Sequence, residues 1–254
     1  MKKPILLYKQ KGETPLECLE RFRAGNMEKY AGVKMTYAGR LDPLAEGILP
    51  ILVGDACKDK EQYLNLPKTY EYEILFGPMT DTGDVLGLVT DMKDVPKEFL
   101  RGGFKNFILD YTGTLKQMYP NYSAKTVRGI PLFDWAKRLE VVERPVRDVS
   151  VFEHEFFDDE KTLTTEELKK EIMKSISLVH GDFRQEVIIQ KWEEVLDKRN
   201  NTIWRIGKCV VRVSSGFYVR AIPEKIFQIF GVPSVIWNIK RVKLGEWGVE
   251  DCIE

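Results

Sequence analysis

Three loop segments of this 254-residue chain carry side chains that could take part in acid–base or nucleophilic chemistry. Asp42 stands directly before a proline, which favours an extended or turn conformation, so we expect its carboxylate on a loop. Thr80–Asp84 is a second loop, in which Thr and Asp side chains can cap turns. Ser214–Arg220 is the third, and an extended chain there places Tyr218 and Arg220 on one face. A carboxylate beside an arginine would stay ionised in a dry pocket, because the guanidinium keeps its proton.

Each of these residues is ambiguous by itself. An Asp-Pro pair most often begins a turn, and an arginine such as Arg220 most often forms a surface ion pair. Tyr70, on an alternating strand pattern, is more often a core residue than a catalytic one. Asp81 and Asp84 could hold a divalent cation, although a site made of oxygen ligands usually needs more of them close by. The residues alone therefore leave catalytic, metal-binding and purely structural interpretations open.

The elements that must position these loops are strands and helices that follow one another without a strict strand–helix–strand rhythm. This order predicts an α+β fold, with a central mixed, largely antiparallel sheet flanked by helices, rather than a doubly wound fold. Alternating and apolar patterns predict strands over 4–8, 70–76, 149–157, 204–206 and 209–213, and amphipathic patterns predict helices over 14–24, 98–107, 132–139 and from Thr164 to about Val179.

Composition excludes several classes of protein. With 39 basic and 39 acidic residues and 11% aromatic residues, the chain can bury a core and is not disordered. The sequence has no apolar run of transmembrane length and no Gly-rich phosphate loop, and its short apolar run near the start leads us to expect no signal peptide. Its four cysteines stand far apart without a CxxC pair, which predicts reduced thiols in the cytoplasm rather than disulfides or zinc. Residues 101–147 hold nine basic against four acidic residues, so a basic face for nucleic acid is compatible with zero net charge.

Motifs with defined spacing follow one another along most of the chain. Residues 39–58 are similar to a GxLDPLAxGxLPxxxGxAxK segment, residues 68–70 to a K-x-Y strand entry, and residues 77–84 to a G-x-x-T-D-T-x-D loop. Further segments, 117–125, 129–136 and 215–220, are similar to Q-x-P-x-x-S-A-x-K, G-x-x-L-Y-x-x-A and K-G-T-Y-I-R. Together, in this order, these segments resemble the TruB-type tRNA pseudouridine synthases.

This resemblance implies one catalytic domain over residues 1–254, with an active-site cleft across the sheet, that isomerises uridine to pseudouridine without a cofactor or metal. Asp42 matches the family's catalytic aspartate, Tyr70 the tyrosine beneath the target base, and Arg220 the arginine that pairs with the aspartate. The aspartate would either attack the nucleoside or take a proton from the ribose, and both routes stay open. The resemblance also implies a set of substrate-binding residues: Tyr37, Gly39, Arg40, Lys58, Asp81, Lys125 and Tyr218.

The implied partner is tRNA, with uridine 55 of its T loop as the target, bound by a cytoplasmic monomer that has no membrane contact. Tyr37 stands where the family has a histidine, a change that bears on how the RNA is held. Residues 156–201 look longer than the family core, and we expect a peripheral insertion with an acidic helix. We also expect no C-terminal RNA-binding domain of the PUA type, so that RNA affinity rests on the catalytic domain.

Three other functions remain as alternatives. The Gly39–Asp42 segment also resembles the GRLD or HRLD motif of relatives that modify ribosomal RNA. A non-catalytic RNA-binding module could keep the same fold, although binding alone needs no carboxylate among phosphates. A metal-dependent phosphoryl-transfer enzyme could use Asp42, Asp81 and Asp84 as metal ligands.

Overall fold

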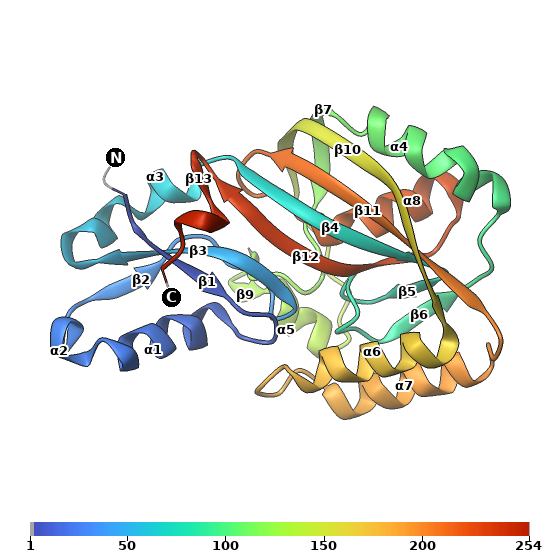
Figure 1. Cartoon of the computed structure of the whole chain (residues 1–254), viewed down its shortest axis with the longest axis horizontal. Coiled ribbons are helices and arrows are strands. Elements are labelled where there is room, and N and C mark those ends of the chain that lie inside the picture. The colour runs from blue at the N-terminus through green and yellow to red at the C-terminus, as the bar shows by residue number, and fades with distance from the viewer. Residues whose placement is uncertain (1–2, 254) are drawn as a thin grey trace.

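The main feature of the fold is a mixed sheet with helices on both faces (Figure 1). The computed structural model describes residues 3–253, and of Arg101 and residues 158–160 it describes the backbone alone. Within these residues the strands of the main sheet follow the order β1, β3, β12, β4, β11, β10, β7, while β2 pairs with β3 and β13 with β12. The strands are β1 (Ile5–Lys9), β2 (Met35–Tyr37), β3 (Ala45–Val53), β4 (Lys68–Phe76), β7 (Gly113–Met118), β10 (Val146–Thr164), β11 (Ile203–Val213), β12 (Ser234–Leu244) and β13 (Trp247–Gly248).

Most neighbouring strands of the main sheet run antiparallel. The pairing of β3 with β12 is parallel, and the other strand pairings of this sheet within residues 3–253 are antiparallel. The predicted α+β class with a mixed, largely antiparallel sheet is therefore confirmed. Two small hairpins stand beside the sheet, and they consist of β5 (Pro78–Thr80) with β6 (Val89–Met92) and of β8 (Thr126–Val127) with β9 (Ile130–Pro131).

Two helices begin where local sequence signals place them. Thr14 and Thr164 each accept a hydrogen bond from the backbone of a glutamate three residues later, and that glutamate bonds back to the threonine, so both helices open with a capping box. The predicted helix over 98–107 is instead a π-helical turn at Phe99–Gly103 followed by a helix. The helices are α1 (Pro15–Gly25), α2 (Met27–Tyr30), α3 (Lys60–Leu64), α4 (Phe104–Asp110), α5 (Leu132–Lys137), α6 (Thr165–Ser177), α7 (Gln185–Asp197) and α8 (Ile222–Phe230).

Side chains alternate between two cores along the central strand β4. Tyr72, Ile74 and Phe76 point into a cluster that includes residues of α4 and α8, whereas Leu75 points into a cluster that includes residues of α6 and α7. Because successive residues of a strand face opposite sides, α4 and α8 cover one face of the sheet and α6 and α7 the other. Figure 1 shows α6 and α7 lying together on the side of the β5–β6 hairpin.

The segment 156–201 was expected at the periphery, but the structure gives it a central packing role. Its Trp192 is fully buried among core residues, and its indole nitrogen donates a hydrogen bond to the Val85 carbonyl at 3.1 Å. The acidic run 158–160 continues strand β10 across a register shift, and its side chains lie outside the described residues. The two helices between β10 and β11 thus complete the core beneath one face of the sheet. Whether they are an insertion relative to the family stays a prediction.

Strand β3 is absent from the set of strands that the sequence patterns predict. It lies between β1 and β12, and most of its residues are buried. A strand buried on both faces gives a continuous apolar run rather than an alternating one, which hides the period of two. Separately, no helix among the described residues is long and apolar enough to cross a bilayer.

Candidate active site

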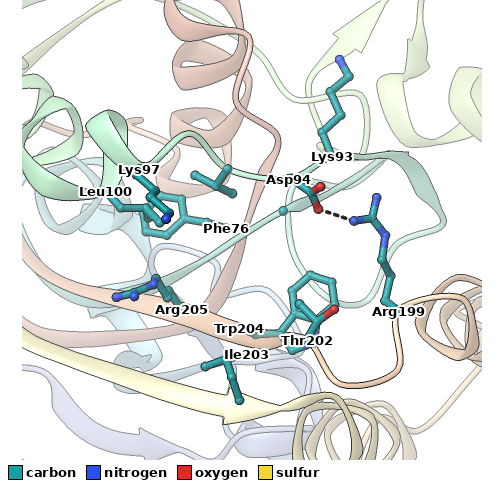
Figure 2. A pocket seen from close by; sticks show the side chains of 12 residues that line it. Phe76, Lys93, Asp94, Lys97, Leu100, Arg199, Thr202, Ile203, Trp204 and Arg205 are labelled. Carbon is teal, nitrogen blue, oxygen red and sulfur yellow. Dashed lines mark hydrogen bonds and ion pairs between the residues drawn. The ribbon is translucent and has the colours of Figure 1, made fainter.

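Two hollows stand out on the surface, and they differ in chemistry. The smaller one, of about 630 Å³, lies at the end of β4 and the start of β11, where Trp204 and Phe76 form part of its wall (Figure 2). Figure 2 shows Asp94 and Arg199 pointing toward one another in this hollow, which we call the Trp204 pocket. Their side chains are 91% and 30% exposed, so this is an ion pair in contact with water.

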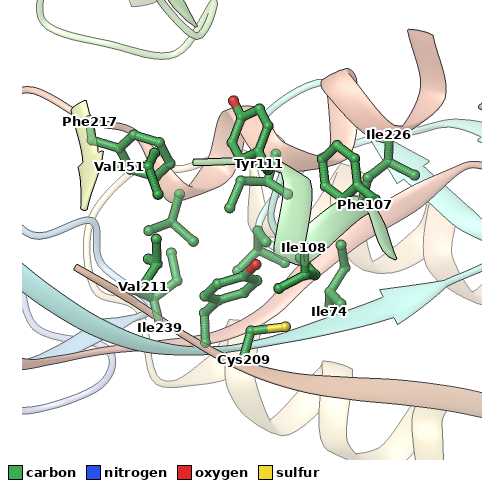
Figure 3. Close-up of a cluster of buried hydrophobic side chains, with 14 of the residues drawn as sticks. Ile74, Phe107, Ile108, Tyr111, Val151, Cys209, Val211, Phe217, Ile226 and Ile239 are labelled. Atoms are coloured by element: carbon green, nitrogen blue, oxygen red, sulfur yellow. The ribbon is translucent and has the colours of Figure 1, made fainter. Parts of the chain in front are cut away.

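The larger hollow is a cleft of about 1200 Å³ that collects segments distant in sequence. It contains the predicted catalytic residues Asp42, Tyr70 and Arg220 together. The cleft lies against the hydrophobic cluster that includes residues of α4 and α8. Phe217 and Ile239 line the cleft and also belong to this cluster, which is shown in Figure 3. The structure therefore brings the three predicted residues to one place, although their catalytic roles stay a proposal.

A bidentate ion pair joins Asp42 to Arg220 at the centre of the cleft. Arg220 Nε donates to Asp42 Oδ2 at 2.7 Å, and Arg220 Nη2 donates to Asp42 Oδ1 at 2.9 Å. The Arg220 side chain is 5% exposed and the Asp42 side chain 38% exposed. The guanidinium is therefore a buried, fixed charge, while the carboxylate it orients remains open to the cleft.

The loop that carries Asp42 is anchored on both sides of that residue. Leu41 is buried in the core beneath α4 and α8, and Leu44 is buried in the core beneath α6 and α7. The fully buried Lys9 donates from its Nζ to the Pro43 carbonyl at 3.2 Å and to the Ala45 carbonyl at 2.6 Å. Burial lowers the pKa of Lys9 to about 8. Sequence reasoning missed Lys9, which nothing in its local pattern separates from a surface lysine.

Arg220 is held by two backbone carbonyls in addition to Asp42. Its Nη1 donates to the Thr82 carbonyl at 2.7 Å, and its Nη2 donates to the Tyr122 carbonyl at 3.1 Å. Gly83 allows the Thr82 loop to come this close, because it has φ +79° and a Cβ there would lie 2.3 Å from the Arg220 carbonyl oxygen. Burial alone would lower the pKa of Arg220, but the charges of Asp42 and Asp84 outweigh it and raise that pKa.

Asp84 is a second buried carboxylate beside the same guanidinium. Its Oδ2 lies 3.7 Å from Arg220 Nε, and its Oδ1 accepts bonds from Thr82 Oγ1 at 2.8 Å and from the Leu86 backbone at 3.0 Å. Burial raises the pKa of Asp84 to about 6; Arg220 opposes this shift, and the Asp42 charge adds to it. The sequence suggested Asp84 only as a possible metal ligand, so its place behind Arg220 was missed.

Two tyrosines complete the centre of the cleft. Tyr70 lies on β4 opposite Val211 and Arg241 and packs partly against the main core. Tyr218 precedes the turn that carries Arg220, and its backbone exchanges two hydrogen bonds with the Gln117 side chain, at 2.7 and 3.1 Å. Burial and the negative charge of Asp42 raise the pKa of Tyr218. Both phenols are therefore positioned by the sheet and its edge.

The predicted substrate-binding residues divide into two groups. Tyr37, Gly39, Arg40 and Tyr218 line the cleft. Lys58 does not line it; this side chain is exposed and pairs with Asp55 at 2.7 Å, a neighbour on the same short helical turn. Lys125 is also absent from the lining, and its Nζ lies 5.5 Å from the centre of the Tyr119 ring.

Asp81 reaches the cleft only through a partner that the sequence did not indicate. Arg184, in the α6–α7 loop, lines the cleft, and its Nη1 pairs with Asp81 Oδ2 at 2.8 Å. The same guanidinium lies 4.5 Å from the centre of the Tyr122 ring. Burial and the Asp81 charge raise the pKa of Tyr122 to about 12. Since the Tyr122 carbonyl accepts a hydrogen bond from Arg220, the α6–α7 loop supports the part of the cleft wall that holds this arginine.

The cleft is lined by more basic than acidic side chains, whereas the whole chain has a net charge of zero. The lining residues include eight basic side chains, which are Arg40, Lys60, Lys68, Lys137, Arg147, Arg184, Arg220 and Arg241, and four acidic ones, which are Asp42, Glu61, Asp84 and Asp182. This excess of positive charge favours a polyanionic ligand. Asp81 and Asp84 are engaged by Arg184, Thr82 and backbone donors, and the part of the chain that the structure describes has no group of three or more candidate metal-binding side chains.

Comparisons with known proteins identify the family of the chain. The family model for "TruB family pseudouridylate synthase (N terminal domain)" matches residues 27–176. The chain is 31% identical over 249 residues to tRNA pseudouridine synthase B of Bacillus cereus and of Bacillus anthracis, which covers 98% of this chain and 68% of each relative. It is 26% identical to tRNA pseudouridine synthase B of Halalkalibacterium halodurans, over 97% of this chain and 67% of that relative.

Solved structures support the fold. A chain of a Cbf5–Nop10–Gar1 complex matches with a TM-score of 0.52 at 18% identity, over 96% of this chain and 50% of that chain. A chain of the archaeal box H/ACA sRNP Nop10–Cbf5 complex matches with a TM-score of 0.51 at 16% identity, over 96% of this chain and 48% of that chain. This chain thus spans about half the length of those chains. Family model and curated relatives together show that the chain belongs to the TruB family of pseudouridylate synthases, which are isomerases.

Proposed function

We propose that this protein isomerises a uridine of tRNA to pseudouridine, and that its target is uridine 55 in the T loop. The observation that carries the proposal is the Asp42–Arg220 pair, in which a buried guanidinium orients a carboxylate that remains open to a positively charged cleft. The relatives named tRNA pseudouridine synthase B support tRNA as the substrate class.

The reaction asks for few protein groups. The bond from the ribose to uracil N1 breaks, the base turns, and the ribose is rejoined to C5, while the C5 proton leaves and N1 gains one. Atoms balance within the nucleoside, so no external reactant is consumed. We assign Asp42 as the group that either attacks the nucleoside or takes a proton from the ribose. We assign Tyr70 to the face of the base, where its ring stacks and its hydroxyl lies within reach of the departing proton.

The cleft also has to compensate for extracting the uridine from its stack, which costs a few kcal/mol. Its excess of basic side chains supplies phosphate contacts. Tyr37, Arg40 and Tyr218 line the cleft around the centre, and we assign them to RNA binding. Lys60 Nζ lies 5.5 Å from the Tyr37 ring, so this tyrosine stands beside a cation that can meet the RNA backbone.

The test uses an unmodified tRNA transcript and chemical mapping of pseudouridine. The wild type should modify uridine 55, and Asp42→Asn should lose activity by at least about a thousandfold, because it removes the reacting charge. Asp94→Asn, at the exposed ion pair of the Trp204 pocket, is the matched control and should keep full activity. Modification of a ribosomal RNA fragment in preference to tRNA would move the substrate to the ribosomal class. Tight RNA binding without any modification would support the non-catalytic module instead.

A further inference from the structure

Three cations on strands β4, β10 and β12 line the cleft beside the Asp42–Arg220 pair. Lys68 begins β4, Arg147 lies near the start of β10, and Arg241 lies on β12. Lys68 is 6% and Arg241 1% exposed, and Arg147 is half-buried. Such a concentration of charge out of water is expensive unless something compensates for it.

Among the side chains that the structure describes, no carboxylate forms an ion pair with any of these three cations. Lys68 Nζ donates to the Leu64 and Leu66 carbonyls, both at 2.5 Å. Arg241 donates from Nε and Nη2 to the Ile48 carbonyl, at 2.7 and 2.5 Å. These neutral acceptors position the two cations without neutralising their charge.

Arg147 is the least satisfied of the three. Its Nε is buried and has no hydrogen-bond partner within the described chain, and its guanidinium lies 5.8 Å from the centre of the Tyr119 ring. Buried polar nitrogens almost always have a partner, so an orphan at a cleft wall points to a ligand.

The three charges act on one another. Burial, followed by the charges of Arg241 and Arg147, lowers the pKa of Lys68 to about 7. The folded protein therefore holds these like charges close together in spite of their mutual repulsion. A bound anion would relieve the repulsion, because it would supply the missing countercharge.

The backbone makes room for Arg147 at one position. Gly216 has φ +81°, and a Cβ on it would lie 1.7 Å from Arg147 Nη1. The preceding residue is Ser215, where the K-G-T-Y-I-R pattern has a lysine. In this chain the positive charge next to the glycine thus comes from β10 instead of from the loop itself.

We propose that Lys68, Arg147 and Arg241 bind one backbone phosphate of the RNA, next to the uridine that reacts at Asp42. The inference rests on the proposed function for the identity of the RNA. The phosphate is favoured over a free carboxylate ligand because the cleft carries twice as many basic as acidic side chains and the reactive carboxylate lies in the same cleft.

One arm of the test needs no RNA activity. Inorganic phosphate, compared with chloride at constant ionic strength, should raise the Tm of the wild type by about 3 °C at ten times its Kd. Arg147→Gln should lose this shift and should be at least as stable as the wild type without phosphate, since it removes an unpaired buried charge. Arg205→Gln, the same change at the Trp204 pocket, should keep the shift. An equal phosphate shift in Arg147→Gln, or a marked loss of its stability, would overturn the site.

The second arm locates the phosphate. A T-arm stem-loop with one neutral methylphosphonate beside the target uridine should react with a kcat/KM about tenfold lower in the wild type, mainly through KM. Arg147→Gln should show the same loss with ordinary RNA and no further loss with the neutral linkage, and Arg147→Lys should recover part of it. The contact would be refuted if the losses from Arg147→Gln and from the neutral linkage were fully additive at both of the linkages that flank the target uridine. If the wild type forms no pseudouridine at all, the proposed function fails, while the phosphate shift still decides whether the anion site exists.

Discussion

The cleft and the Trp204 pocket both contain an arginine paired with an aspartate, yet only the pair in the cleft has a buried guanidinium. In the Trp204 pocket, Asp94 is almost fully exposed and Arg199 partly so. In the cleft, Arg220 is buried, binds Asp42 through two nitrogens, and is held by the Thr82 and Tyr122 carbonyls. Two charges about 4 Å apart interact by about 1 kcal/mol in water and about 4 kcal/mol at an effective dielectric near 20.

The difference shows that burial and fixed orientation matter more than the number of charges. An exposed pair such as Arg199–Asp94 contributes about 0–1 kcal/mol and is screened by salt. A buried pair cannot lose one partner without leaving an uncompensated charge. The following four experiments test this contrast, beginning with the largest expected effect.

Arg220→Lys should lower kcat at least about a hundredfold, because lysine cannot donate to both Asp42 oxygens and both carbonyls at once. Arg199→Lys is the matched change in the Trp204 pocket and should stay within about twofold of the wild type. Single-turnover rates on a tRNA transcript and urea unfolding give the two readouts. Arg220→Lys activity above a tenth of the wild type would remove the contrast between the two pairs.

Asp84→Asn should make stability less dependent on pH. The folded pKa of Asp84 is about 6, above the ordinary value of 3.8, so the native state binds more protons than the unfolded state between these values. Wild-type stability from Asp84 is thus fully present below about pH 4 and falls as pH rises through about 6, by at most about 3 kcal/mol. Urea unfolding of both proteins at several pH values gives the difference curve. A flat curve would mean that Asp84 titrates normally.

Arg184→Ala should lower kcat/KM about tenfold and destabilise the protein by about 1 kcal/mol. The change removes the pair with Asp81 and the contact with the Tyr122 ring, and thereby loosens the carbonyl that binds Arg220. Arg199→Ala is its counterpart in the Trp204 pocket. If both variants behaved alike, the α6–α7 loop would have no special place in the site.

Lys93→Gln and Lys97→Gln should change RNA affinity by less than about twofold, even when combined. Both side chains are exposed in the Trp204 pocket. Affinity measured over a range of salt concentrations should keep the wild-type slope, since no phosphate contact is lost. If the slope of log affinity against log salt concentration fell by about two, RNA would contact this pocket as well.

Much of the architecture could be anticipated from local signals. The capping threonines Thr14 and Thr164 place two helix starts, and alternation along 70–76 identifies the central strand. The buried strand β3 could not be recognised from its period, since both of its faces pack against other elements. Lys9 and Arg184 escaped notice for another reason: their partners are loops that only the packed fold brings to them.

Sequence alone determined which candidate groups this protein carries: the motif around Asp42, the arginine 178 positions later and the tyrosine between them were singled out by the resemblance of their segments to the TruB family. Only the tertiary structure decided which groups meet. It placed Asp84, not Asp81, behind Arg220, paired Asp81 with an arginine 103 residues away, and kept Lys58 outside the cleft. The physical reason is that such contacts depend on sheet register and on the packing of α6 and α7, which are summed over the whole fold and are not encoded at either residue.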